Sequence, residues 1–216
     1  MAPEFIKLGS LYFDGRPQRV GAAYYWESLS LGSTVPGLEL QWVRLQNGIL
    51  IADRCVCSNI SWEQLNQSGF IYGTPIQIDG HAYLCRSLCV GSKKGDPNEW
   101  DTALDEVGSK NDIWHWKDMF FWGQEQAEKY PADYSRRGFD SAGYWSHAFV
   151  SHKSAYSGFR PVLEPLTQVV SNCTSITGER ISLWGPQGEN INGILISVDD
   201  YDLINGAGNP GYLYPG

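Results

Sequence analysis

The stretch from Asp112 to Leu166, DIWHWKDMFFWGQEQAEKYPADYSRRGFDSAGYWSHAFVSHKSAYSGFRPVLEPL, decides how this chain folds. It carries four tryptophans (with Trp100 just upstream) out of nine in the chain, and every histidine except His81. Aromatic side chains at this density bury large areas and keep polar groups available, so they build either a core or a ligand platform. The sequence therefore predicts an aromatic centre here, without naming a ligand.

Length and composition indicate a globular protein that folds unaided. The chain has 216 residues, of which 42% are hydrophobic, enough for a proper core. No apolar run approaches the roughly 18 residues of a membrane helix. The N-terminal residues MAPEFIKLGSLYF lack the apolar segment of a secretory signal. We therefore expect a cytoplasmic protein with no membrane partner.

The charge of the chain argues against one class of partner. A formal net charge of −8 and a pI near 4.9 oppose binding to a nucleic acid polymer, because that mode needs a basic surface. A local basic pocket for one small anion remains compatible with this charge.

The residues before Asp112 predict three hairpins. Each has a turn dipeptide, Asp-Gly or Asn-Gly, between extended runs, which is the strongest short signal for a hairpin. The turns are Asp14-Gly15 between Leu11–Phe13 and Gln18–Trp26, Asn47-Gly48 between Leu38–Leu45 and Ile49–Cys57, and Asp79-Gly80 within Ile76–Cys85.

Two short helices are expected in the same part of the chain. Ser61, with Gln64 three residues later and Gly69 as a stop, has the pattern of a capped helix. The run from Asp96 to Gly108 places Pro97 in the first turn and closes on glycine, which predicts the second helix.

Within the central stretch, Ile113–Gln124 predicts a helical turn followed by a strand at Met119–Trp122. The polar run Glu125–Asp140 predicts irregular structure, and Gly143–Ala148 and Gly158–Leu163 predict two closing strands.

The composition changes near Leu166, which divides the chain into domains 1–166 and 167–216. Three or four short strands with glycine turns predict a small all-β, barrel-like second domain. Its acidic run Asp199–Asp202 is interpreted as an exposed turn, because it lacks the spaced ligands of a calcium loop. Tyr212-Leu213-Tyr214 on an edge strand is a candidate contact for a homo-oligomer.

Several short motifs follow one another along the first domain, and their order carries a resemblance. They are Asn98-Glu99-Trp100-Asp101, Trp114 and Trp116, Gly143 and Trp145, and Gly158-Phe159-Arg160. This order resembles the C-type-lectin-like fold, in particular the branch of the formylglycine-generating and sulfatase-modifying enzymes. The resemblance implies an α+β domain with small antiparallel sheets and two short helices. The chain also looks like a group of proteins borne by phages and prophages of Gram-positive bacteria.

The chemistry of that branch does not carry over. Its oxidases hold copper with a cysteine pair near the C-terminal strands, whereas residues 90–166 contain no cysteine. Its iron-dependent relatives use an H-x-x-x-H-x-E set, which is not found in this sequence. We therefore expect no cofactor, no metal and no catalytic residue, but a scaffold whose loops bind a ligand.

Arginines among aromatic side chains suit a planar anion such as a nucleotide, because a guanidinium stacks on rings and grips carboxylate or phosphate. The alternative is that Arg160 is a buried ion-pair partner, that Arg136 and Arg137 lie in a solvated loop, and that the tryptophans form the core. The candidate ligand-binding residues are Trp114, His115, Trp116, Lys117, Trp122, Arg136, Arg137, Tyr144, Trp145, His147 and Arg160.

The cysteines offer a second candidate site. Cys55 and Cys57, together with Cys85 and Cys89, are interpreted as buried free thiols, with a zinc site or a disulfide as alternatives.

Three functions are compatible with these features. The leading hypothesis is a non-enzymatic, phage- or prophage-borne protein that captures a small anionic ligand or a host protein, to counter host defence from the bacterial cytosol. The second is a virion component that recognises a glycan or protein receptor. The third is an enzyme with a site at His115, His147 and Asp140.

Overall fold

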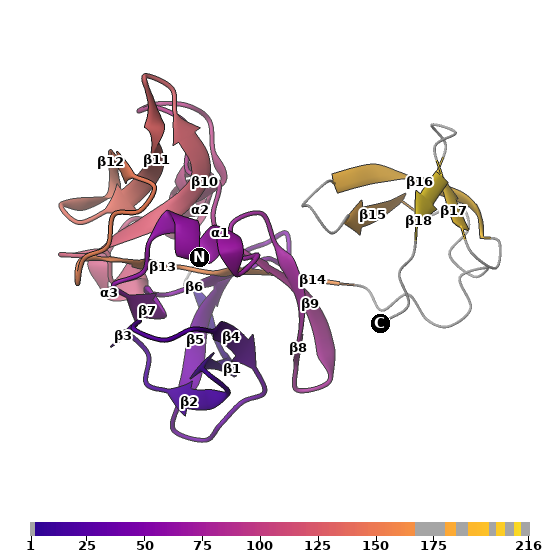
Figure 1. Cartoon of the computed structure of the whole chain (residues 1–216), viewed down its shortest axis with the longest axis horizontal. Coiled ribbons are helices and arrows are strands. Elements are labelled where there is room, and N and C mark those ends of the chain that lie inside the picture. Colours follow the sequence, from indigo (N-terminus) through magenta and orange to yellow (C-terminus); the bar gives the residue numbers. More distant parts are fainter. Residues whose placement is uncertain (1–2, 167–179, 185–189, 199–201, 206–209, 213–216) are drawn as a thin grey trace. The chain divides into compact units, whose positions relative to one another are not determined.

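The computed structural model describes residues 3–166, 180–184, 190–198, 202–205 and 210–212. The chain divides into two compact units, Met1–Leu166 and Thr167–Gly216 (Figure 1).

The first unit contains an eight-stranded sheet with the order β2-β1-β5-β6-β14-β9-β8, in which β4 also pairs with β1. All ladders of this sheet are antiparallel. Strand β14, the last strand of the unit in the sequence, lies between β6 and β9. The strands are β1 (Glu4–Phe13), β2 (Arg16–Gln18), β4 (Leu29–Gly32), β5 (Glu39–Arg44), β6 (Leu50–Ala52), β8 (Thr74–Ile78), β9 (His81–Arg86) and β14 (Val162–Pro165).

The three predicted hairpins are all present in this sheet. Asp14-Gly15 and Asp79-Gly80 have positive φ at both residues, as a two-residue type I′ turn requires. Asn47-Gly48 joins β5 to β6 with Gly48 at positive φ. The arm predicted over Gln18–Trp26 is shorter than expected, because β2 ends at Gln18.

A second sheet has six strands in the order β12-β11-β10-β13-β7-β3. Three of them, β10, β11 and β12, form an antiparallel meander, and β12 lies at its outer edge (Figure 1). The strands are β3 (Ala22–Ala23), β7 (Cys57–Ser58), β10 (Phe120–Ala127), β11 (Tyr130–Gly138), β12 (Ser141–Phe149) and β13 (Ser157–Phe159).

The prediction of irregular structure over Glu125–Asp140 is wrong, because most of this run belongs to β10 and β11. Polar residues in β11 occupy buried positions: Ser135 and Arg137 are buried although neither is apolar. A strand whose inward positions are polar has no hydrophobic alternation, so the sequence pattern does not reveal it.

The single closing strand predicted over Gly158–Leu163 is instead two strands in different sheets, β13 and β14. The chain changes sheet at Arg160-Pro161. Proline has no N–H to donate to a ladder, and the Pro161 carbonyl accepts a hydrogen bond from Ala52 N at 3.0 Å.

Both predicted helices are present, and a third is added. Helix α1 (Trp62–Gln67) has the predicted capping box between Ser61 and Gln64. Helix α2 (Glu99–Val107) begins later than expected: its N-cap is Asn98, which accepts a hydrogen bond from Asp101 N, so Pro97 precedes the helix. Helix α3 (Asn111–Trp114) corresponds to the predicted helical turn. None of the helices described here is long and apolar enough to cross a membrane.

Tryptophans build the two cores of the first unit. Trp42, Trp62 and Trp122 belong to one buried cluster, and Trp100 and Trp114 belong to the other. Buried indole N–H groups find carbonyl partners: Trp100 donates to Ala142 O at 2.7 Å and Trp122 to Ile60 O at 2.9 Å. Much of the predicted aromatic centre is therefore core.

The second unit contains a four-stranded antiparallel sheet in sequence order. Its strands are β15 (Arg180–Trp184), β16 (Asn190–Val198), β17 (Asp202–Asn205) and β18 (Pro210–Tyr212). Residues 199–201 of the acidic run and residues 213–214 proposed for self-association lie outside the described residues. In class the chain is α+β, with sheet predominating.

Candidate functional site

The ladder register places each residue of the meander on one of two faces. Directly paired residues in antiparallel strands point to the same side, and sequence neighbours point to opposite sides. We call the side that packs on α2 the α2 face; it carries Phe121, Asp133, Ser135, Arg137, Trp145, His147 and Phe149. We call the other side the α1 face; it carries Phe120, Trp122, Tyr134, Arg136, Tyr144, Ser146 and Ala148. The candidate residues of the meander are thus divided between opposite faces.

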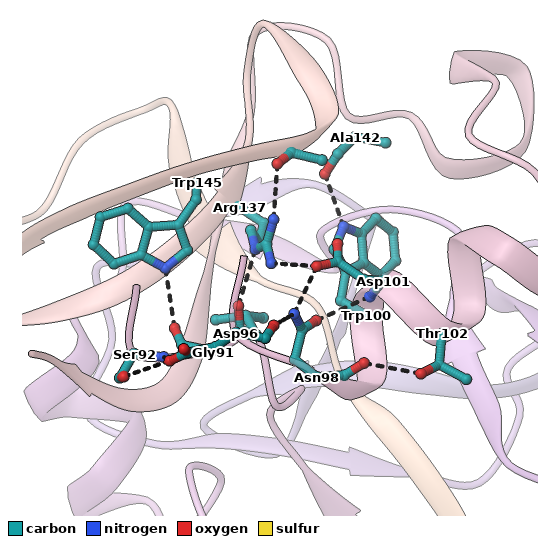
Figure 2. Close-up of polar contacts among 12 residues, drawn as sticks. Gly91, Ser92, Asp96, Asn98, Trp100, Asp101, Thr102, Arg137, Ala142 and Trp145 are labelled. Carbon is teal, nitrogen blue, oxygen red and sulfur yellow. Dashed lines mark hydrogen bonds and ion pairs between the residues drawn. The ribbon is translucent and has the colours of Figure 1, made fainter. Parts of the chain in front are cut away.

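On the α2 face, Arg137 is a structural ion-pair residue (Figure 2). Its side chain is 3% exposed and donates to Asp101 Oδ2 at 2.8 Å, to Gly143 O at 2.7 Å and to Val90 O at 3.0 Å. These bonds tie the meander to α2 and to the loop before it. Trp145 adds another tie, because its indole N–H donates to Gly91 O at 3.0 Å.

His147 forms an Asp-His pair on the same face. Its Nδ1 lies 2.6 Å from Asp133 Oδ2, and its ring stacks on Tyr130 with centroids 4.0 Å apart. A carboxylate in this position fixes the tautomer with the proton on Nδ1 and leaves Nε2 as an acceptor. Such a pair can accept a proton. The hydroxyl opposite it in the ladder, Ser135, is fully buried and therefore inaccessible as a nucleophile.

On the α1 face, part of the surface is covered and part is open. Trp62 of α1 stacks on Tyr134 with centroids 3.6 Å apart, and Trp122 is fully buried beside them. Beyond this contact lies Arg136, which is partly exposed, with Tyr144 exposed next to it.

The guanidinium of Arg136 lies over an aromatic ring. Its guanidinium carbon is 4.0 Å from the centroid of Phe120 and 5.9 Å from that of Trp122. Within residues 3–166 its side chain donates two hydrogen bonds, both long, to the hydroxyls of Ser146 at 3.4 Å and Ser157 at 3.3 Å. A guanidinium has five N–H donors, so most of the capacity of Arg136 is unused.

Arg136 also lacks a counter-charge. Within residues 3–166 no carboxylate forms an ion pair with it, in contrast to Arg86, Arg137, Arg54 and Arg44. Partial burial lowers the pKa of its guanidinium, and the nearby Tyr144 and Asp133 act in the opposite direction. The site therefore holds a partly desolvated positive charge in an acidic protein.

Further aromatic rings pack around Phe120, the ring on which this arginine is stacked. Phe139 stacks on Phe120 with centroids 4.8 Å apart and an interplanar angle of 11°. Tyr144 lies 6.2 Å from Phe120, and Tyr156 meets Phe139 edge-on at 6.2 Å. Tyr144 is 42% exposed and Tyr156 is 58% exposed. We call Phe120, Arg136, Phe139, Tyr144 and Tyr156 the Arg136 site.

Phe139 reaches this position through an unfavourable backbone conformation. Its φ is +75°, in the left-handed region that bulky residues rarely occupy. Two hydrogen bonds from its N–H, to Trp116 O at 2.9 Å and Met119 O at 3.0 Å, hold it there. Conformations of this kind cluster at functional sites, where the surrounding structure maintains them.

The candidate residues around α3 are not part of the Arg136 site, although Trp116 and Lys117 adjoin it through the backbone of Phe139. Trp114 is fully buried, Trp116 is partly buried with its N–H bonded to Ser109 O, and Lys117 is exposed. His115 contacts Arg54 through Nε2 at 2.9 Å, and its Nδ1 lies 3.4 Å from Asp53 Oδ2. Thus His115 and His147 have different carboxylate neighbours, and neither neighbour is the exposed Asp140 of the predicted enzyme site.

Arg160 lies in the core with no exposed surface. It donates to Ala52 O at 2.9 Å and Trp114 O at 2.6 Å, and its guanidinium carbon lies 4.8 Å from the Phe121 ring. Burial lowers the pKa of Arg160 to about 10. Its position agrees with the alternative of a buried structural residue, although carbonyls and rings replace the expected acid.

The sequence reasoning missed Phe120, Phe139, Tyr156 and Asp133. The first three are ordinary aromatic residues in a stretch full of them. Asp133 precedes His147 by 14 residues, a spacing that carries no signal, and only the strand register brings the two side chains together.

Four cysteines are free of disulfides: Cys55, Cys57 and Cys85 are buried, and Cys89 is partly buried. Burial raises the pKa of Cys55 to about 11, which keeps it a thiol. Cys173 lies outside the described residues. Across the part of the chain that was searched, no three His, Cys, Asp or Glu side chains are grouped to hold a metal ion.

A hollow of about 280 Å³ lies between the start of β1 and the end of α2, lined in part by Glu4, Arg44 and Glu106. None of its lining residues belongs to the Arg136 site.

Comparison with known proteins does not assign a family. The chain matches no protein-family model, no curated protein and no solved structure.

Proposed function

We propose that this protein binds a small, ring-bearing anion of nucleotide type at the Arg136 site and releases it unchanged. The observation that carries the proposal is the state of Arg136: it is stacked on Phe120, partly buried, and without a carboxylate partner among residues 3–166. A charge left unpaired at the edge of a core is costly unless something pairs with it.

The geometry suits an anionic group next to a ring. The free N–H groups of Arg136 can donate to a phosphate or carboxylate, and the hydroxyl of Ser146 lies beside them. The exposed rings of Tyr144 and Tyr156 supply stacking surface for a base or similar ring. With one arginine in the site, the best ligand carries one anionic group, as a nucleoside monophosphate does.

Adenosine 5′-monophosphate is the probe for a direct test. Isothermal titration should show binding of this nucleotide, with weaker binding of adenosine and of inorganic phosphate, because each lacks half of the recognised chemistry. The variant Arg136→Gln should lose about tenfold or more in affinity, since hydrogen bonds to a charged group are worth about 1.5–3 kcal/mol.

The matched control is Arg44→Gln, which removes the same charge from an exposed arginine paired with Glu4. It should bind like the parent protein. Equal losses in the two variants would show that only net charge matters, and no binding of any of the three probes would remove the proposal. Chromatography of the recovered nucleotide should show it unmodified; a product would favour an enzyme instead.

The wider setting of the proposal rests on the resemblances and not on any contact. A C-type-lectin-like scaffold of phage or prophage origin, working in the cytosol of a bacterial host, would use such a site to remove a small signalling anion and so counter host defence. Capture of a host protein is the alternative for the same surface. A gene position beside tail genes would favour the virion hypothesis.

A further inference from the structure

The outer edge of β12 carries unpaired backbone groups. In an antiparallel ladder, alternate residues direct their N–H and C=O groups to opposite sides of the strand. Val150 N donates to Ala132 O. In the regular part of β12, from Trp145 onward, the N–H and C=O groups of even-numbered residues therefore point toward β11, and those of odd-numbered residues point away from the sheet. Within residues 3–166, the N–H groups of Trp145 and His147 bond to no backbone group outside the ladder, and the His147 carbonyl receives only a 3.5 Å contact from Ser146 Oγ. The carbonyl of Phe149, at the end of the strand, already accepts a hydrogen bond from His152 N at 2.8 Å.

This edge lacks the charges and proline that usually prevent pairing, although a register shift opposite Arg137 and Gly138 marks a bulge near its start. Exposed edge strands are normally blunted by lysine, other charged residues or proline. The sequence of β12, SAGYWSHAF, contains no lysine, arginine, aspartate, glutamate or proline. Phe149 at its end is 54% exposed. An additional strand could therefore pair here without a charge to desolvate.

The order of side chains in β12 is complementary to itself. If two such strands run antiparallel with Ser146 opposite Ser146, each large residue meets a small one or a flat ring. Tyr144 then lies opposite the partner's Ala148, Phe149 opposite the partner's Gly143, and Trp145 opposite the partner's His147. In the same register the outward-facing Trp145 and His147 are paired with each other, so their backbone groups form hydrogen-bonded pairs.

We propose that β12 pairs with β12 of a second copy of this chain, around a two-fold axis at Ser146, to give one continuous sheet. The partner is a second copy because the size pattern matches itself. The net charge of −8 on each copy opposes association, but the strand itself is uncharged, and charges farther than about 8 Å away are screened at physiological ionic strength.

Such a dimer would place the α1 faces of the two copies side by side on one surface of the continuous sheet. Arg136 pairs with Ser146 in the ladder, so the two Arg136 residues would lie on either side of the axis, with three strand spacings of about 4.8 Å between their backbones. A joint role of the two Arg136 sites in ligand binding rests on the function proposed above, whereas the dimer itself does not.

A cysteine on the axis provides a position-specific test. Ser146 would form a non-hydrogen-bonded pair with its own copy, with Cα atoms about 4.5 Å apart, which is within the range of a disulfide. Ser146→Cys should therefore give a reductant-sensitive dimer under mild oxidation on non-reducing gels. The control Ser151→Cys places a thiol at an exposed position beyond the strand, and on the same gels it should run as a single chain without a cross-link, as should the parent protein. No cross-linking of Ser146→Cys, or equal cross-linking of both variants, would overturn the proposal.

Sedimentation equilibrium on the parent chain provides an independent measurement. The parent should have twice the mass of one chain, and Phe149→Lys should halve it by placing a charge at the edge. Tyr25→Lys makes the same kind of change at a residue that is 80% exposed elsewhere, and it should leave the mass unchanged. A monomeric parent, or the same effect from both substitutions, would contradict the proposed pairing.

Discussion

Arg136 and Arg137 are neighbours in the sequence and lie on opposite faces of one strand. Arg137 is buried, paired with Asp101 and bonded to two carbonyls. Arg136 is stacked on Phe120 and, among residues 3–166, donates two long hydrogen bonds to hydroxyls. The difference shows that what lies across each face, and not the arginine itself, decides whether it holds the fold or remains available to a ligand.

The largest expected effect is on the α2 face. Arg137→Ala would leave the carbonyls of Val90 and Gly143 without their donor, and Asp101 without its counter-charge but still bonded to Asn98. Breaking a buried pair of this kind costs about 3 kcal/mol or more. Asp101 is 40% exposed, so solvent moderates the loss toward the lower end of that range. Urea unfolding of the purified variant measures this change.

The control for that measurement is Arg136→Ala, which removes a cation–π contact worth about 1 kcal/mol or less. It should unfold at nearly the same urea concentration as the parent. If both variants lost equal stability, the two arginines would share one structural role and the contrast between the faces would be wrong.

A smaller effect is expected at Phe139, where strain and ligand surface can be separated. Asparagine tolerates the left-handed conformation better than phenylalanine does. In Phe139→Asn the relief of strain and the lost stacking on Phe120 are each about 1 kcal/mol and oppose each other. Thermal unfolding should thus change little.

The same variant should bind adenosine 5′-monophosphate several-fold more weakly, because the ring that supports Phe120 is gone. Calorimetry on Phe139→Asn and on Phe139→Tyr, which retains a ring, distinguishes the two contributions. Unchanged affinity in Phe139→Asn would remove Phe139 from the Arg136 site.

Hairpin turns and a helix cap could be predicted from the sequence, because each depends on a few neighbouring residues. The Asp14-Gly15 and Asp79-Gly80 turns need positive φ at both residues, and the Ser61–Gln64 cap satisfies its own helix end. Such features depend on a few adjacent residues, so the residues alone predict them.

The faces of the meander depend on register, which adjacent residues do not reveal. A shift by one residue would exchange Arg136 with Arg137, and nothing in the local sequence fixes that choice. The candidate list therefore combined the two arginines, and it included Arg160 because burial against carbonyls, as at Ala52 and Trp114, has no sequence signal.

The smallest expected effect concerns His152, which lies beside the same indole as Arg136. Its ring centroid is 6.5 Å from that of Trp122. Partial burial, and then the charge of Arg136, lower the pKa of His152 below its usual value. Because the folded-state pKa lies below the unfolded one, the unfolded chain takes up this proton first, and stability is lost as the pH falls below about 6.5.

A bound anion reverses the sign of the field that His152 experiences. Protonated His152 then stabilises the complex, so affinity should rise modestly, about twofold, as the pH falls from about 8 to about 6. The ligand phosphate also titrates near pH 6, so the quantity to compare is the ratio of parent to His152→Gln affinity at each pH, in which the ligand's own titration cancels. A ratio that stays constant would place His152 outside the field of the ligand, and a ratio that falls with pH decrease would show that the bound group is not anionic. Either outcome would bear on the α1 face alone, because His147 on the α2 face is the same in both proteins and its contribution cancels in the ratio.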